Sequence, residues 1–301
     1  EEALEVYGQP ARWAALVREH RSCLAALLSR ENGKPLRFAA DELETAARYF
    51  DYYGAYADKL DGRVPPVASH LHVSIGYEPL GVVGHIVPWN YPADIFARGV
   101  APSLAVGDTV VVKPAPETTF ITLELARLAV AAGVPPGVVN VIPGDGLLTG
   151  AALAAHPDVD ALAFCGSAAG RLAPVVSLEL GGKSAGIILP DVETGPAAAA
   201  LARGFCYNSA QSCGAKSRLL VPAARRDEAI EAVRACFASL IIGAPDEPDV
   251  YLGPLISARQ LARVLDYVEQ GRREGGVLAA GGRRPPRKGF FMEPTLFHGL
   301  G

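Results

Sequence analysis

From residue 81 onward, short apolar runs rich in β-branched residues alternate with longer stretches of helical spacing. The runs GVVGHIVP, TVVVKP, GVVNVIP and ALAFCGS are typical of buried strands, because each is brief and ends at glycine, proline or serine. Residues 118–133 instead repeat apolar side chains every three to four positions and end at Gly133 before two prolines, which predicts a helix. Such alternation indicates βαβ units and a parallel sheet.

A second alternating set follows the first. SAGIILP and SRLLVP read as strands, and residues 195–207 and 226–239 read as helices. Residues 257–276 predict a further helix that begins with a capping box at Ser257 and Gln260. Its expected apolar face consists of Leu261, Val264, Leu265 and Val268.

These patterns predict an α/β chain of two domains. Residues 1–180 would form a helical N-terminal segment and a Rossmann-like parallel sheet, which binds ligands at the carboxyl ends of its strands. Residues 181–301 would form a second α/β domain. Only residues 166–174 separate the strands ALAFC and VVSLEL, fewer than a helical crossover usually needs. Either this connection is unusually tight or the chain skips residues here.

Composition excludes several classes of function. The 301 residues carry a net charge of −4 and are 50% hydrophobic, so the chain has ample core and no basic footprint for nucleic acid. No apolar run reaches the length of a membrane span. The acidic start EEALEVYGQP does not resemble a signal peptide, and its lack of an initial Met suggests trimming.

The cysteines and histidines do not form a metal-binding or disulfide pattern. The five cysteines are odd in number and never spaced as C-x-x-C, so we expect a reduced, cytoplasmic chain without a zinc site. His70 and His72 alternate along an expected strand, where two solvated histidines are favoured over a shared site.

Two glycine-rich loops compete as a phosphate site. GDGLLTG (144–150) follows a strand and resembles a dinucleotide fingerprint with altered spacing. GSAAGR (166–171) also follows a strand and adds the hydroxyl of Ser167. Either loop could be an ordinary strand-to-helix turn, and spacing alone does not decide between them.

Three polar residues stand where their surroundings do not require them. Asn90 lies in VPWNYP, Glu179 interrupts the apolar strand VVSLEL, and Cys213 lies in the polar, glycine-flanked loop NSAQSCGAKSR. Cys206, seven residues earlier, lies in an apolar run and reads as packing. Taken singly, the three have simpler interpretations as a turn former, a paired strand-end acid and a small hydrophobe.

Taken together, they resemble the aldehyde dehydrogenase superfamily. The matching segments, in family order, are VPWNYP, VVVKPAPET, GVVNVIPG, FCGS, LELGGKS and NSAQSCGAKSR. Glu179 and Cys213 keep the family's separation of 34 residues, and ENGKP, LGPLIS and EPTLF extend the match over the whole chain. The resemblance implies a cofactor domain followed by a catalytic domain, with the latter incomplete at the C-terminus.

The resemblance also implies a mechanism, that of an NAD(P)-dependent aldehyde dehydrogenase of the hydrolytic type. The Cys213 thiolate would attack the aldehyde carbon, since a thiolate is a strong nucleophile. The side-chain amide of Asn90 and the backbone N–H of Cys213 would hold the oxyanion. After hydride transfer, Glu179 would activate the water that hydrolyses the thioester, more effectively if burial raised the pKa of that carboxyl.

NAD is the cofactor that the resemblance implies, with NADP as the alternative. Lys113 would bond the adenosine ribose, and Ser167 with Gly166 the phosphates, which favours the second glycine loop. Family members often carry an acid three residues after the lysine; here Pro116 stands there and Glu117 follows. The complete matched cofactor set is Lys113, Gly166, Ser167, Trp89, Ile86, Leu180 and Gly146.

The substrate-lining residues implied by the family are Tyr91, Asp94, Arg98 and Ser212. Asp94 and Arg98 fall on one face of the helix after Asn90, so they could simply form a local ion pair. Our hypothesis is that Arg98 instead biases the site toward aromatic or polar aldehydes.

The chain also departs from the family. It ends at Gly301, about two-thirds of the way through a typical member, which suggests that a longer chain was shortened. Three functions remain open: an aldehyde oxidoreductase working as a homodimer or homotetramer, an inactive relative acting through protein contacts, and an esterase using Cys213 and Glu179 alone.

Overall fold

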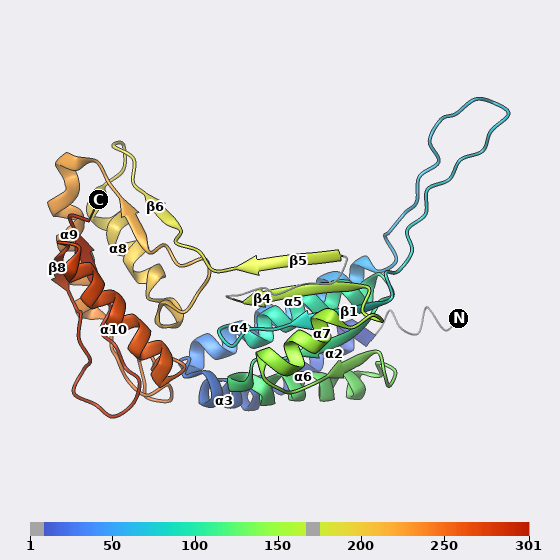
Figure 1. Cartoon of the computed structure of the whole chain (residues 1–301), viewed down its shortest axis with the longest axis horizontal. Coiled ribbons are helices and arrows are strands. Elements are labelled where there is room, and N and C mark those ends of the chain that lie inside the picture. The colour runs from blue at the N-terminus through green and yellow to red at the C-terminus, as the bar shows by residue number, and fades with distance from the viewer. Residues whose placement is uncertain (1–8, 167–174, 301) are drawn as a thin grey trace. The chain divides into compact units, whose positions relative to one another are not determined.

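A computed structural model of the chain describes residues 9–166 and 175–300, which form two compact units (Figure 1). Unit 1 comprises residues 1–27 and 40–180, and unit 2 comprises residues 28–39 and 181–301. The sequence interpretation assigned all of residues 1–180 to one domain, whereas the structure groups residues 28–39 with unit 2. The cause is tertiary packing, because the ring of Phe38 packs edge-on against the ring of Tyr251, with the ring centroids 5.1 Å apart.

Unit 1 contains the predicted parallel sheet, in the strand order β3-β2-β1-β4-β5. Every neighbouring pair is parallel. The order reverses between β1 and β4, and open sheets bind ligands in the crevice at such a switch point. The strands are β1 (Val82–Ile86), β2 (Thr109–Lys113), β3 (Val139–Val141), β4 (Ala161–Gly166) and β5 (Val175–Leu180).

Helices connect the first four strands. α5 (Pro92–Ala105) follows β1, and α6 (Thr119–Ala132) follows β2 and ends at Gly133 in the left-handed conformation, as its sequence predicts. α7 (Ala151–Ala155) precedes β4 and packs beneath it through Leu153. β4 and β5 pair in parallel, but the short connection between them, with Ser167 of the second glycine loop, lies outside the described residues.

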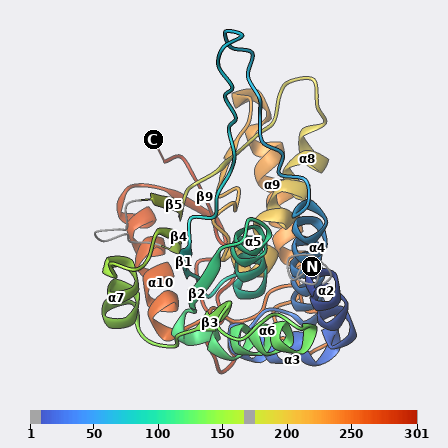
Figure 2. The ribbon, with the colours of Figure 1, turned by 90° about the vertical axis from the view of Figure 1, so that its right-hand side faces the viewer.

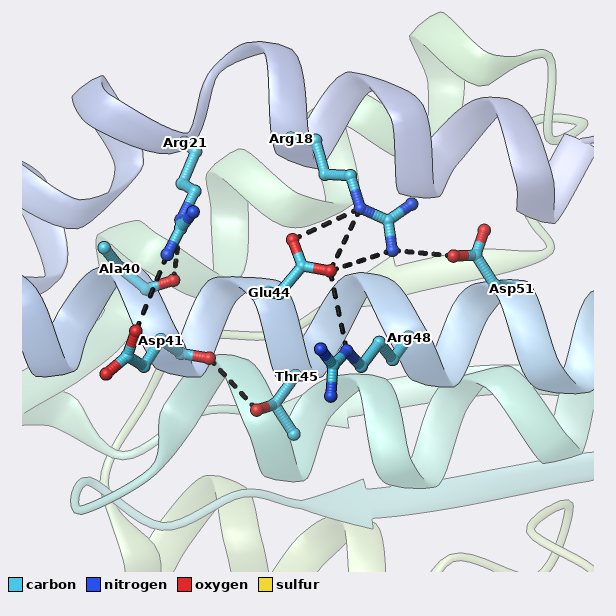
Figure 3. A network of polar contacts seen from close by, with 8 residues as sticks. All are labelled: Arg18, Arg21, Ala40, Asp41, Glu44, Thr45, Arg48 and Asp51. Carbon is cyan, nitrogen blue, oxygen red and sulfur yellow. Dashed lines mark hydrogen bonds and ion pairs between the residues drawn. The ribbon is translucent and has the colours of Figure 1, made fainter.

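The N-terminal helices are α2 (Gln9–Glu19), α3 (Arg21–Asn32) and α4 (Leu36–Tyr56). In unit 1, Trp13 of α2 stacks on Phe50 of α4 with ring centroids 4.0 Å apart. A charge network also links these two helices and joins Arg18 of α2 to Glu44 and Asp51 of α4 (Figure 3).

In this network the Arg18 guanidinium bonds Asp51 at 2.7 Å and Glu44 at 3.1 Å. The hydrogen bond from Arg18 lowers the pKa of the Glu44 carboxyl. Arg48 approaches the same carboxylate at 3.6 Å. Exposed pairs of this kind each contribute about 0.2–1 kcal/mol, so the network supplements the aromatic core between α2 and α4 and does not replace it.

Residues 57–80 form an extended arm between α4 and β1 that projects from the sheet of unit 1 (Figures 1 and 2). Its two halves meet at a single antiparallel bridge, Arg63↔Ile75. The strand predicted at His70 and His72 is wrong, because both residues lie in irregular, exposed chain, and no strand of the described residues pairs with them. Large apolar side chains are exposed along the arm, at Leu60, Val64, Val67, Leu71, Val73, Ile75, Tyr77 and Leu80.

Unit 2 has a parallel pair of strands, β6 (Ala185–Ile187) with β7 (Arg218–Leu220), and an antiparallel pair, β8 (Val277–Ala280) with β9 (Leu296–His298). Its helices are α8 (Thr194–Phe205), α9 (Arg226–Ser239) and α10 (Ala258–Arg273).

Packing and capping in unit 2 follow the sequence closely. Ala198 and Ala202 of α8 pack with Val233 and Phe237 of α9 in one buried cluster. The predicted cap of α10 is confirmed, since Ser257 Oγ accepts from the backbone N–H of Gln260 at 3.3 Å. Of the four residues expected on the apolar face of α10, Leu261 and Val268 are buried, and Val264 and Leu265 are half-buried.

Across residues 9–166 and 175–300, no helix is both long enough and apolar enough to cross a membrane.

Candidate active site

The carboxyl edge of the unit 1 sheet carries most of the predicted cofactor residues. Ile86 ends β1, Lys113 ends β2, Gly166 ends β4 and Leu180 ends β5. Register pairs Ile86 with Lys113, and Gly166 with Leu180. The fold therefore brings these four residues to one edge, on both sides of the switch point between β1 and β4.

Lys113 is almost fully buried, at 3% relative exposure. Burial lowers the pKa of its ammonium group, while the carboxylates of Glu117 and Asp145 act in the opposite direction. Glu117 is thus close enough to act on Lys113 electrostatically. A carboxylate beside this lysine would repel a further phosphate, such as the 2′-phosphate of NADP.

The first glycine loop uses its backbone donors internally. Gly146 opens a π-helical turn, and the preceding Asp145 carboxylate accepts from Leu147 N at 2.8 Å and Leu148 N at 2.7 Å. A carboxylate of the chain therefore takes the place that an anion would need at this turn. Gly146 stays a predicted cofactor contact, near the adenosine end.

Trp89, Asn90 and Tyr91 form the turn that leads from β1 into α5. Tyr91 occupies the N-cap, but an acid from α4 supplies the cap: Glu42 Oε1 accepts from Ala93 N at 2.9 Å and from Asp94 N at 3.3 Å.

Sequence reasoning missed Glu42, which is only 4% exposed. Its spacing held a usable signal, because Glu42 shares the helical face of the buried Ala39 and Ala46. A carboxylate among buried small residues on an amphipathic helix indicates a fixed partner.

The ion pair that the structure shows for Arg98 is with Glu179, the predicted general base. Arg98 Nη2 lies 3.7 Å from Glu179 Oε1. The two side chains are 37% and 54% exposed, so the Glu179 carboxylate is not buried. Arg98 reaches across from α5 to β5, and thus contacts the candidate base directly.

An open cavity of about 560 Å³ runs beside this pair, between α5 and the face of β4 and β5. The pair lies on its lining, and alternate residues of β5 point into it. Its other lining side chains include Ile95, Pro102, Ala163, Cys165, Val175 and Ser177.

In unit 2 the two cysteines of the loop segment differ as predicted. Cys206 is fully buried at the end of α8, and burial raises the pKa of its thiol to about 12. Cys213 is exposed in a turn before β7, beside the half-buried Ser212. Gly182 lies close to this turn, since a Cβ placed there would be 3.8 Å from the carbonyl oxygen of Cys213.

The chain between the two cysteines adopts an unusual conformation. Asn208, Ser209 and Ala210 all have positive φ, at 51°, 54° and 61°. Each such residue costs roughly 1 kcal/mol or more, so the surroundings must hold it. Ser209 Oγ donates to Gly253 O at 2.9 Å, and Gln211 Oε1 accepts from the backbone N–H of Ile256 at 3.0 Å.

Known proteins are similar to this chain in sequence and in fold. The profile of the aldehyde dehydrogenase family matches residues 11–300. The chain belongs to the aldehyde dehydrogenase family. It is 39% identical to hydroxyisobutyraldehyde dehydrogenase of Mycolicibacterium austroafricanum over 297 residues, which cover 95% of the chain. It is also 39% identical to retinal dehydrogenase 2 of Homo sapiens over 295 residues, which cover 94% of the chain.

A solved aldehyde dehydrogenase from Bacillus cereus, described as an NAD+ complex, superposes with a TM-score of 0.95 at 37% identity over 99% of the chain. The chain spans 59% and 57% of the two sequence relatives and 62% of that structure. Family and fold are therefore as the resemblance implied.

In the described residues, no group of three or more His, Cys, Asp or Glu side chains is placed to hold a metal ion.

Proposed function

We propose that this chain acts in the oxidation of an aldehyde to a carboxylic acid, with NAD as the hydride acceptor. The observation that carries the proposal is the contrast between the two thiols of one segment. Cys206 is buried with a raised pKa, whereas Cys213 is exposed on a turn that follows a hydrogen-bonded, strained stretch. A nucleophile must be accessible, and a packing thiol need not be.

The residues at the carboxyl edge of the sheet fit a dinucleotide. Lys113 offers ammonium donors for ribose hydroxyl groups, and Ile86 and Leu180 offer apolar surface for rings. Glu117 beside Lys113 favours NAD over NADP by charge repulsion. When bound, the nicotinamide supplies the acceptor for the hydride that leaves the substrate carbon.

The chain's own residues would carry the other steps. The Cys213 thiolate bonds to the aldehyde carbon, while the Asn90 amide and the Cys213 backbone N–H hold the developing oxyanion. After the hydride has left, Glu179 takes a proton from the water that attacks the thioester carbonyl. The C–S bond then breaks, which releases the carboxylate and regenerates the Cys213 thiolate.

The assay for this proposal is aldehyde-dependent formation of NADH. We expect Cys213→Ser to lower kcat by about 10³-fold or more, because the hydroxyl is a far weaker nucleophile. Cys23→Ser, at another exposed cysteine outside the site, is the matched control and should leave the rate unchanged. A chain whose NADH formation survives Cys213→Ser would not work in this way.

We also propose that the substrate is an aromatic or polar aldehyde and that the enzyme is a cytoplasmic homodimer or homotetramer. The exposed apolar side chains of the arm at residues 57–80 support the oligomer, since such surface is typical of subunit contacts.

A further inference from the structure

The ion pair between Arg98 and Glu179 joins a helix that its neighbours hold firmly to a strand that has fewer packing contacts. Arg98 lies in the middle of α5, whereas Glu179 lies on β5, at the edge of the sheet. The two residues are 81 positions apart in the chain, so the fold alone creates this contact.

Two contacts fix the position of α5. At its start, Glu42 caps the backbone N–H groups of Ala93 and Asp94. Five residues after Asp94, Gly99 lets the helix approach β1 so closely that a Cβ there would lie 2.6 Å from His85 Nδ1. The residue beside this contact is Arg98, so its backbone has little room to move.

Glu179 has much less support of its own. β5 pairs only with β4 among the described strands, and most of its side chains are exposed. Its carboxylate is 54% exposed at the end of a flexible side chain. A side chain of this kind samples several rotamers unless a partner selects one.

We propose that Arg98 is a positioning residue for Glu179, and that its charge holds the carboxylate toward the water that hydrolyses the thioester. This inference rests on the proposed function. It concerns a single step: water oxygen bonds to the acyl carbon, Glu179 accepts the water proton, and the C–S bond breaks. In the proposed mechanism Glu179 takes a proton only in the hydrolysis step, so we expect loss of Arg98 to slow the release of product and not the first turnover.

The test separates these two phases of the reaction. The chain is mixed with benzaldehyde and NAD, the first turnover is followed as NADH, and the acylated chain is counted by intact mass. We expect Arg98→Gln to leave the first turnover unchanged, to slow hydrolysis about 3- to 10-fold, and to accumulate acylated chain. Arg98→Lys, which keeps the charge, should recover part of the loss.

Three controls exclude a general defect. Arg127→Gln removes an exposed arginine of α6 that pairs with Glu124, and should behave like the wild type. Hydroxylamine attacks a thioester without a protein base, so it should clear the acylated Arg98→Gln chain as fast as the wild type. In a Glu179→Gln background, Arg98→Gln should add no further effect, because one interaction is removed only once.

The possible results lead to different conclusions. Equal hydrolysis rates in the wild type and Arg98→Gln, or an additive effect in the double variant, would overturn the role of Arg98. Slowed formation of the first NADH would assign Arg98 to substrate binding and overturn it as well. If the wild-type chain forms no NADH from benzaldehyde and NAD, the proposed function fails, and this inference with it.

Discussion

Glu42 Oε1 lies 2.9 Å from the backbone nitrogen of Ala93, so an acid on α4 caps the helix that follows the candidate oxyanion residue Asn90. The carboxylate is buried and also accepts from Asp94 N. Negative charge at a helix N-terminus is favourable, and charge-assisted bonds are stronger than neutral ones.

We therefore predict that Glu42→Gln lowers the free energy of unfolding by about 2 kcal/mol. It should also reduce kcat more than it changes KM, because Asn90 lies two residues before the capped helix. Urea unfolding and steady-state kinetics measure the two effects. Glu44→Gln, on the same helix but paired with Arg18, is the control and should cost at most about 1 kcal/mol. Equal losses in both variants would refute a special role for the cap.

Gly99 tests how closely α5 approaches the sheet. In most helices Gly→Ala stabilises by about 1 kcal/mol, because alanine restricts the unfolded chain. At Gly99 the new methyl group would meet the ring of the buried His85, so we expect Gly99→Ala to destabilise unit 1. Gly204 of α8 has no atom within 4 Å of its added Cβ, and Gly204→Ala should be neutral or stabilising. Thermal unfolding of both variants checks whether their signs differ.

The sequence was most informative where local chemistry determines local structure. The helix at 226–239, the cap at Ser257 and the burial of Cys206 all followed from spacing or immediate context. The parallel sheet followed from its alternation with helices.

The sequence was least informative where distant partners decide. A strand at His70 and His72 needs a neighbour that the arm does not have. Residues 28–39 join unit 2 because of contacts more than 200 positions away, such as Phe38 with Tyr251. The pairing of Arg98 with Glu179 is a similar case: periodicity placed Arg98 near Asp94, but only the fold could bring it to β5.

Because His85 is buried, we predict that the free energy of unfolding falls at acidic pH. The imidazole is buried on β1 beside Ser103, with Nε2 3.1 Å from Ser103 Oγ, and burial lowers its pKa to about 4 from 6.5. Below pH 6.5 the unfolded chain binds a proton that the folded chain does not, so stability is complete above 6.5 and falls as the pH drops toward 4. The full loss is about 3 kcal/mol.

Urea unfolding at pH 7.5 and at pH 5 measures this slope, above the range where most carboxylates titrate. His85→Gln can still bond Ser103 but binds no proton, so we expect it to lose most of the difference between the two pH values. If His85→Gln retains the same pH dependence as the wild type, other groups cause it.

Thiol labelling can test the assignment of the nucleophile without any cofactor. Burial raises the pKa of the Cys206 thiol to about 12, so almost none of it is ionised at pH 7.5, and iodoacetamide also has no access to it. Cys213 and Cys23 are exposed. We predict that brief treatment of the folded chain carboxamidomethylates these two cysteines and leaves Cys206 unmodified until urea unfolds unit 2. Peptide mass mapping at successive times gives the order.

Loss of aldehyde oxidation should follow modification of Cys213, and it should proceed at the same rate in Cys23→Ser, because only the thiol at 213 bonds to substrate. Inactivation that instead follows Cys23, or that precedes any label at Cys213, would place the nucleophile elsewhere.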